Sequence, residues 1–210
     1  CHLHRAGRQV KVALLGDAAA LPADAARALQ RALAEHVPVE PTLPSAAPDL
    51  AIDALLGIGA NRAPQGPIAA AIRHLDAWRA PVLAIDVPSG LHADTGRPLG
   101  DDCVVAAHTL TMLTWKPGLF TGVGRDQAGV AWMDDLGIES ADVAPRAWLC
   151  GLRPRPSRRH AAHKGSFGDA AIVGGAAGML GAALLAARAA HAAGAGRVFV
   201  EMLDPEAPGV

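Results

Sequence analysis

The amino-acid sequence predicts an α/β protein with a parallel, doubly wound sheet. Short apolar runs end at glycine or aspartate, as at residues 10–16 and 82–85. Amphipathic stripes lie between such runs, as at residues 22–35, and a glycine-rich turn joins an apolar run to a helix within residues 169–193. Strands that alternate with helices are typical of a parallel sheet.

The first half of the chain contains two predicted helices. In residues 22–35 the apolar residues recur at helical spacing, and Pro22 stands near the start, where proline is tolerated. A second stripe covers residues 68–78 and follows Gly66 and Pro67. We expect strands at residues 10–16, 37–40, 49–56 and 82–85.

In the second half we expect strands at residues 103–113, 129–133, 169–173 and 197–202, and a helix at residues 179–193. Residues 170–187 form an uncharged stretch of 18 residues, which is close to the length of a membrane span. Glycines interrupt this stretch, so we interpret it as a strand, a glycine turn and a helix.

Composition narrows the class of partner. The chain is 51% hydrophobic, enough for a sizeable core, and its formal net charge is −1 without long runs of like charge. We therefore expect no nucleic-acid partner and no membrane partner. Three cysteines without CxxC spacing suit a reducing compartment, and no signal-peptide pattern is visible, so we expect a cytoplasmic protein.

Asp86 is the first candidate for chemistry, because it stands where the apolar run 82–85 stops and Pro88 and Gly90 prevent the strand from continuing. Ligands of open α/β sheets bind at the carboxyl ends of strands. From the pattern alone, an aspartate that caps the following turn is the commoner alternative.

Asp53 lies inside the predicted apolar strand 49–56, and Ser89 lies in the turn after the neighbouring strand 82–85. An ionised carboxylate inside an apolar strand needs a partner, because burying it unpaired is costly. The alternatives are a capping role for Asp53 and a turn hydroxyl for Ser89.

A glycine-containing loop, residues 57–62 (GIGANR), directly follows a predicted strand, where phosphate-binding loops occur. Arg62 stands where a third glycine would complete a dinucleotide fingerprint, so the fingerprint is weak and an ordinary turn is the alternative. Lys116 lies in a Lys-Pro-Gly turn. It either faces a substrate phosphate or, as the commoner default, is solvated.

Four motifs, taken together, resemble a known family. AIDVPSGLHADTGRPLG (residues 84–100) with KPGL (116–119), and DALLGIG (53–59), are similar to NAD(P)H-hydrate epimerases. HKGSFG (163–168) and GGAAGMLGAA (174–183) resemble the opening of ADP-dependent NAD(P)H-hydrate dehydratases. The sequence thus resembles the bifunctional NAD(P)H-hydrate repair enzymes, in which the two are fused in this order.

The resemblance implies a Rossmann-like, three-layer parallel sheet of the YjeF N-terminal type, followed by the start of a ribokinase-like α/β domain. Residues 1–150 would be the epimerase domain without its N-terminal part, residues 151–163 a linker, and residues 164–210 the beginning of the dehydratase. The linker is rich in arginine and contains two prolines, and a phosphate-binding patch is the weaker alternative for its arginines.

The implied activity is repair of hydrated nicotinamide cofactors. The epimerase interconverts the R and S hydrates of NADH or NADPH, and the dehydratase restores NAD(P)H from the S epimer with ADP or ATP. Potassium would be bound by Asp53, by Ser89 and by an asparagine of an Asn-Asn-Gly-Gly-Asp loop that precedes the sequence. We therefore expect a fragment of impaired activity from a larger, homo-oligomeric enzyme.

The family's site residues carry over onto matching positions. Asp86 would be catalytic and would also contact the substrate. The other implied substrate-binding residues are Gly57, Ile58, Gly59, Ala60, Asn61, Arg62, Ala63 and Ala182. Two rival hypotheses are an enzyme that uses intact dinucleotide or a sugar, and a non-catalytic nucleotide-binding or scaffolding module on the epimerase fold.

Overall fold

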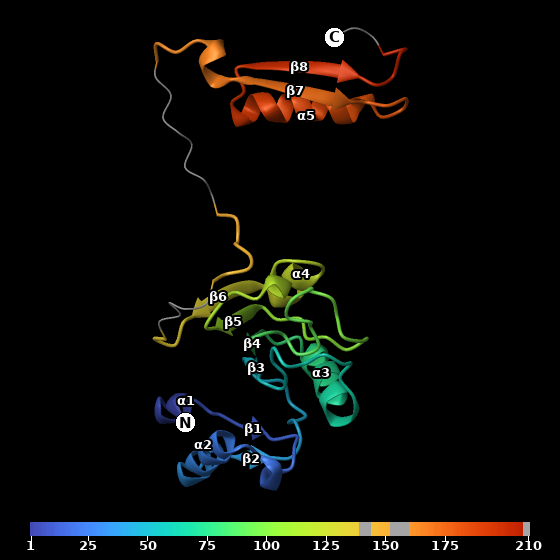
Figure 1. Cartoon of the computed structure of the whole chain (residues 1–210). Coiled ribbons are helices and arrows are strands. Elements are labelled where there is room, and N and C mark those ends of the chain that lie inside the picture. Colours follow the sequence, from blue (N-terminus) through green and yellow to red (C-terminus); the bar gives the residue numbers. More distant parts are fainter. Residues whose placement is uncertain (139–143, 152–159, 208–210) are drawn as a thin grey trace. The chain divides into compact units, whose positions relative to one another are not determined.

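The computed structural model describes residues 1–138, 144–151 and 160–207. The chain divides into two compact units, Cys1–Trp148 and Leu149–Val210, whose elements are labelled in Figure 1. Most of the predicted linker, residues 152–159, lies outside the described residues.

A four-stranded parallel sheet is the centre of the first unit. Its strands lie in sequence order and are β3 (Ala51–Asp53), β4 (Val82–Ile85), β5 (His108–Met112) and β6 (Val130–Asp134). Every pairing is parallel, as predicted. Because Asp53 pairs in register with Ala84, the carboxyl ends of β3 and β4 lie at the same edge.

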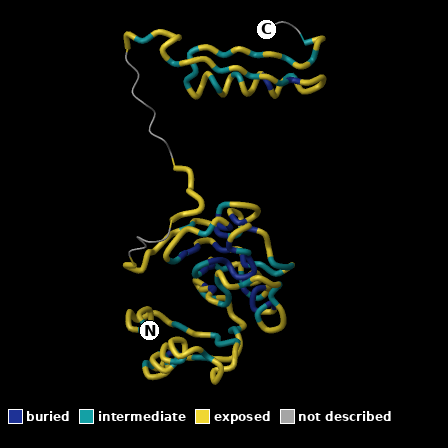
Figure 2. Tube along the Cα trace, in the orientation of Figure 1, coloured by how far each residue is buried: buried dark blue, intermediate teal, exposed yellow. Residues whose placement is uncertain are grey.

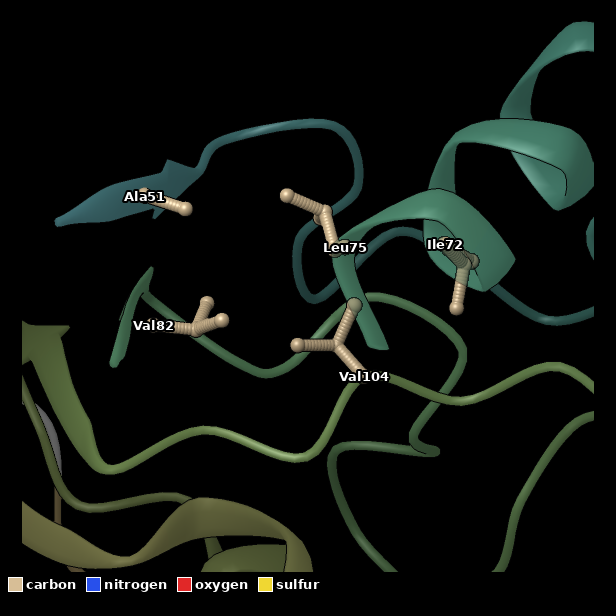
Figure 3. Packing of buried hydrophobic residues seen from close by; sticks show 5 residues of the cluster. All are labelled: Ala51, Ile72, Leu75, Val82 and Val104. Atoms are coloured by element: carbon tan, nitrogen blue, oxygen red, sulfur yellow. The ribbon is translucent and has the colours of Figure 1, made fainter. Parts of the chain in front are cut away.

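Helix α3 (Gly66–Trp78) connects β3 to β4 and covers one face of this sheet. Figure 3 shows Ile72 and Leu75 of this helix beside Ala51 and Val82 of the strands and Val104 of the following segment. All five are buried, and Ile72 is completely inaccessible to solvent. This apolar cluster packs α3 against β3 and β4.

The first 40 residues form smaller elements. They are α1 (His2–Arg5), β1 (Val12–Ala13), η1 (Ala18–Ala20), α2 (Ala23–Ala34) and β2 (Val39–Glu40). Strands β1 and β2 pair in parallel in a two-stranded sheet of their own and are shorter than predicted. Figure 2 shows that this segment is mostly exposed, whereas the buried residues gather around β3, β4, β5 and α3.

The predicted strand at residues 103–113 is wrong over its first half. The backbone N–H of Val104 donates to the carbonyl of Ser89 at 2.9 Å, and that of Ala106 donates to Gln127 at 2.8 Å. These bonds go to loop and helix carbonyls, and hydrogen bonding to the sheet begins only at Ala107, whose N–H donates to Val82 of β4 at 2.9 Å. The predicted strand at residues 49–56 is likewise shorter, because β3 ends at Asp53.

The segment between β5 and β6 contains η2 (Pro117–Leu119) and α4 (Gly124–Ala128). A second apolar cluster, composed of Val87, Leu91, Ala93, Leu119 and Ala128, joins it to the loop after β4. A Cβ added to Gly118 would come within 2.3 Å of the carbonyl oxygen of His92, so only glycine fits. This close approach fixes the Lys-Pro-Gly turn against the loop that carries Asp86 and Ser89.

The second unit contains η3 (Lys164–Phe167), β7 (Asp169–Gly174), α5 (Leu180–Ala193) and β8 (Arg197–Met202). Strands β7 and β8 pair in parallel and α5 connects them, which confirms the prediction of strand, glycine turn and helix for residues 170–187. Within the described ranges, no helix combines the length and apolar character needed to cross a bilayer.

Candidate active site

Asp53 and Ser89 are in direct contact at the carboxyl edge of the sheet. The hydroxyl of Ser89 donates to Asp53 Oδ1 at 2.7 Å, and the backbone N–H of Ser89 donates to Oδ2 at 2.8 Å. Each residue is only 1% exposed. The Ser89 hydroxyl oxygen also accepts from the backbone N–H of Leu56 at 2.9 Å, so the side chain joins the β3 loop to the β4 loop.

Burial raises the pKa of the Asp53 carboxyl above its ordinary value, while the hydrogen bonds from Ser89 and from the Leu55 backbone lower it. Desolvation is the larger effect.

Hydrogen bonds from neighbouring groups reach Asp53 Oδ1 twice and Oδ2 once, and the Ser89 hydroxyl accepts one hydrogen bond. Each carboxylate oxygen and each hydroxyl has two lone pairs, so Oδ2 and the hydroxyl retain accepting capacity. Such hard oxygen atoms are the kind of ligand that hard cations take in proteins.

Asp86 follows β4 in a left-handed backbone conformation, with φ of 73°. Aspartate adopts this conformation more readily than most residues, because its short side chain causes less steric conflict. The backbone N–H of Asp86 still donates to Leu110 of β5 at 2.7 Å, so the residue remains tied to the sheet. The chain turns sharply here.

Two groups engage the carboxylate of Asp86. Lys116 Nζ lies 2.6 Å from Oδ1, and the backbone N–H of Ile58 donates to Oδ2 at 3.2 Å. A Cβ added to Gly57 would lie 3.1 Å from Oδ2, so the carboxylate is in close contact with the loop after β3. Asp86 therefore connects that loop with the Lys-Pro-Gly turn.

Lys116 corrects an expectation drawn from the sequence. The solvated turn lysine that we took as the default is wrong, because the Lys116 side chain is only 11% exposed. Its ammonium donates to the Met112 carbonyl at 2.5 Å in addition to its ion pair with Asp86. The partner lies 30 positions away in the sequence, which no local pattern reveals.

The loop after β3 is only partly drawn into this site. Ala60 N–H donates to the Gly57 carbonyl at 3.0 Å, which closes a turn, and Ile58 is 61% exposed. Asn61 and Arg62 are exposed. The structure thus brings together five predicted site residues, which are Asp53, Gly57, Ile58, Asp86 and Ser89. Ala182 is exposed on α5, in the second unit.

Thr111 is a polar residue of β5 that the sequence analysis missed. It is completely buried, and its hydroxyl has no hydrogen-bond partner among the described residues. Thr109 lies on the same face and donates to the Ala128 carbonyl at 2.8 Å. Threonine at alternate positions of a predicted strand, with an apolar residue after each, is the signal that could have identified them.

Known proteins are similar in sequence to most of this chain. The bifunctional NAD(P)H-hydrate repair enzyme of Leishmania major is 39% identical over 213 residues, which are 93% of this chain and 38% of that enzyme. The Escherichia coli enzyme of the same description is 39% identical over 165 residues, 72% of this chain and 30% of its own length. That of Coxiella burnetii is 34% identical over 216 residues, 96% of this chain and 43% of its own length. The chain thus spans less than half of these relatives.

The sequence profile of the family described as YjeF-related protein N-terminus matches residues 1–118. This region contains Asp53, the loop after β3, Asp86, Ser89 and Lys116. Together with the relatives above, the match confirms the resemblance inferred from the motifs. Because it covers more than half of the chain, the protein belongs to the family of YjeF-related N-terminal domains.

Proposed function

We propose that the first unit epimerises NADH or NADPH hydrate at the carbon of the nicotinamide ring that carries the added hydroxyl. The Asp86 carboxylate at the sheet edge, held between Lys116 and the loop after β3, is the observation that carries this proposal. The names of the relatives support the choice of substrate.

The chemistry requires a group that moves a proton. Inversion can proceed when the carbon–oxygen bond breaks, the protonated hydroxyl leaves as water, and water then adds from the opposite face and releases a proton. In its protonated form Asp86 gives a proton to the leaving hydroxyl, and the resulting carboxylate then takes a proton from the incoming water, so that the group ends as it began. The loop Gly57 to Ala63 holds the dinucleotide through backbone N–H groups, and the exposed Arg62 meets a phosphate.

Asp53 and Ser89 would bind potassium in this proposal. The ion would offset the charge of the buried Asp53 carboxylate and stiffen the two loops that Ser89 joins. Burial raises the pKa of Asp53 because it makes the ionised carboxylate costly. A bound cation would offset this cost, which supports the assignment.

The second unit, from residue 164 onward, would belong to the ATP- or ADP-dependent dehydratase, with ADP or ATP as co-substrate. Ala182, near the start of α5 and after the glycine-rich turn, would contact the hydrate. The two reactions together would return both hydrate epimers to NAD(P)H.

We also infer a homo-oligomeric, cytoplasmic protein. Ile52, Val130 and Trp132 are about half exposed on the β3–β6 sheet, which supports association with further copies. Cys1, Cys103 and Cys150 are all free thiols, which suits a reducing compartment.

The test uses the full-length gene product with purified R hydrate of NADH or NADPH in potassium buffer. Chromatography should show conversion to the S hydrate, and Asp86→Asn should slow it by at least 10²-fold. Asp94→Asn is the matched control, because Asp94 is an exposed aspartate of the same loop. Binding without conversion by the unmodified protein would favour the scaffolding alternative.

Potassium is tested by stability. Potassium chloride should raise the free energy of unfolding more than choline chloride at equal ionic strength, because a ligand of the folded state stabilises it. Asp53→Asn should abolish the difference. Equal effects of both salts would contradict potassium binding.

A further inference from the structure

Lys116 is the most deeply buried lysine of the described residues, and it takes no part in the proton transfer itself. Lys11 and Lys164 are exposed, whereas the Lys116 side chain is 11% exposed. A buried ammonium is costly unless it is paired and hydrogen-bonded. Lys116 meets both conditions, through Asp86 Oδ1 at 2.6 Å and the Met112 carbonyl at 2.5 Å.

The backbone around Lys116 fixes where its ammonium lies. Lys116 precedes η2, and the Leu119 N–H donates to its carbonyl at 3.1 Å. Gly118 packs directly on the backbone of residues 92 and 93, and its N–H donates to the Ala93 carbonyl at 2.6 Å. The lysine therefore extends from a turn that is anchored to the loop following Asp86.

The same ammonium restricts the Asp86 carboxylate. Lys116 engages Oδ1, so Oδ2 is left to face the loop after β3, where it accepts from Ile58 and touches Gly57. The Asp86 side chain is itself only 13% exposed, so solvent screens this ion pair weakly. Without Lys116, the carboxylate would lose both its counter-charge and the contact that selects its rotamer.

We infer that Lys116 is a positioning residue for the epimerisation, which acts by holding the Asp86 carboxylate toward the loop that binds the substrate. This inference rests on the proposed function and adds to it a second required side chain. It commits Lys116 to acting through Asp86, and not through the substrate phosphate.

The experiment measures epimerisation by the full-length gene product and its variants Lys116→Ala, Lys116→Arg and Asp86→Asn, together with the double variant Lys116→Ala/Asp86→Asn. Lys116→Ala should lower kcat on the order of 10²-fold, because misplacing a catalytic group by about 1 Å has an effect of this size. KM should change by less than about threefold, since a positioning residue does not bind the substrate. Lys11→Ala, at an exposed lysine of the same unit, should change neither constant.

Two further readouts separate positioning from a merely structural role. Propylammonium should restore part of kcat in Lys116→Ala but not in Asp86→Asn, and Lys116→Arg should retain more activity than Lys116→Ala. The double variant should be no slower than Asp86→Asn alone, because Lys116 acts through Asp86. If Lys116→Ala does not fold, the double variant removes the unpaired carboxylate, and Lys116→Arg still reports on kcat.

Each outcome either supports or overturns the positioning role of Lys116. A larger rise in KM than fall in kcat would overturn positioning in favour of phosphate binding. Normal kcat in Lys116→Ala, or a loss that neither arginine nor propylammonium relieves, would also overturn it while leaving the proposed function intact. A wild-type protein that does not interconvert the epimers would overturn the proposed function, and this inference with it.

Discussion

Ser89 donates two hydrogen bonds to Asp53, from its hydroxyl to Oδ1 at 2.7 Å and from its backbone N–H to Oδ2 at 2.8 Å. The two residues are 36 positions apart and both are buried. The pair joins the loops after β3 and β4, and these loops carry Gly57, Ile58 and Asp86. The geometry of the candidate site thus depends on this contact.

Ser89→Ala should destabilise the first unit by about 2 kcal/mol, because a buried carboxylate loses a donor and the Leu56 N–H loses its acceptor. Urea unfolding followed by circular dichroism measures the change. Ser45→Ala is the control, since Ser45 is exposed in the same unit. Equal stability of Ser89→Ala and the unmodified protein would show that the contact contributes nothing.

The raised pKa of Asp53 predicts how stability depends on pH. Because burial makes the folded state hold this proton more tightly than the unfolded state, the contribution of the group to stability is fully present below its ordinary value of 3.8. It is lost as the pH rises through the raised pKa of the folded state. The free energy of unfolding should therefore fall with pH in this window more steeply than in Asp53→Asn.

Unfolding curves at a series of pH values, recorded in choline buffer without potassium, measure this difference in slope. The comparison uses slopes, because asparagine also changes the hydrogen bonds to Ser89. Parallel curves for the two proteins would mean that Asp53 titrates alike in the folded and unfolded states.

The sequence predicts much of the fold because most elements are bounded by local signals. The strand at residues 82–85 and the one at residues 197–202 have the predicted bounds in β4 and β8. Helix α3 begins at Gly66 and Pro67, as the turn signal indicates. The segment 103–106 differs because the backbone N–H groups of Val104 and Ala106 donate to Ser89 and Gln127, which lie in distant segments that no local pattern reveals.

The site is less predictable from pattern alone. A strand end identifies Asp86 as a candidate, and a carboxylate within an apolar strand identifies Asp53, but the resemblance and not the spacing implies their roles. The burial of Lys116 depends on the packing of Gly118 against His92, a contact between segments 26 residues apart in the sequence. Local periodicity carries no information about such contacts.

Gly57→Ala should lower kcat for epimerisation by about tenfold with little change in stability. The added Cβ would lie 3.1 Å from Asp86 Oδ2, so the carboxylate must move by a few tenths of an ångström. It cannot move freely, because Lys116 and the Ile58 N–H both engage it. The measurement is kcat and KM with the R hydrate, alongside thermal unfolding of the same samples.

Gly16→Ala is the matched control, because Gly16 is exposed and a Cβ there would meet no atom within 4 Å. An unchanged kcat for Gly57→Ala would mean that the position of the Asp86 carboxylate does not limit the reaction.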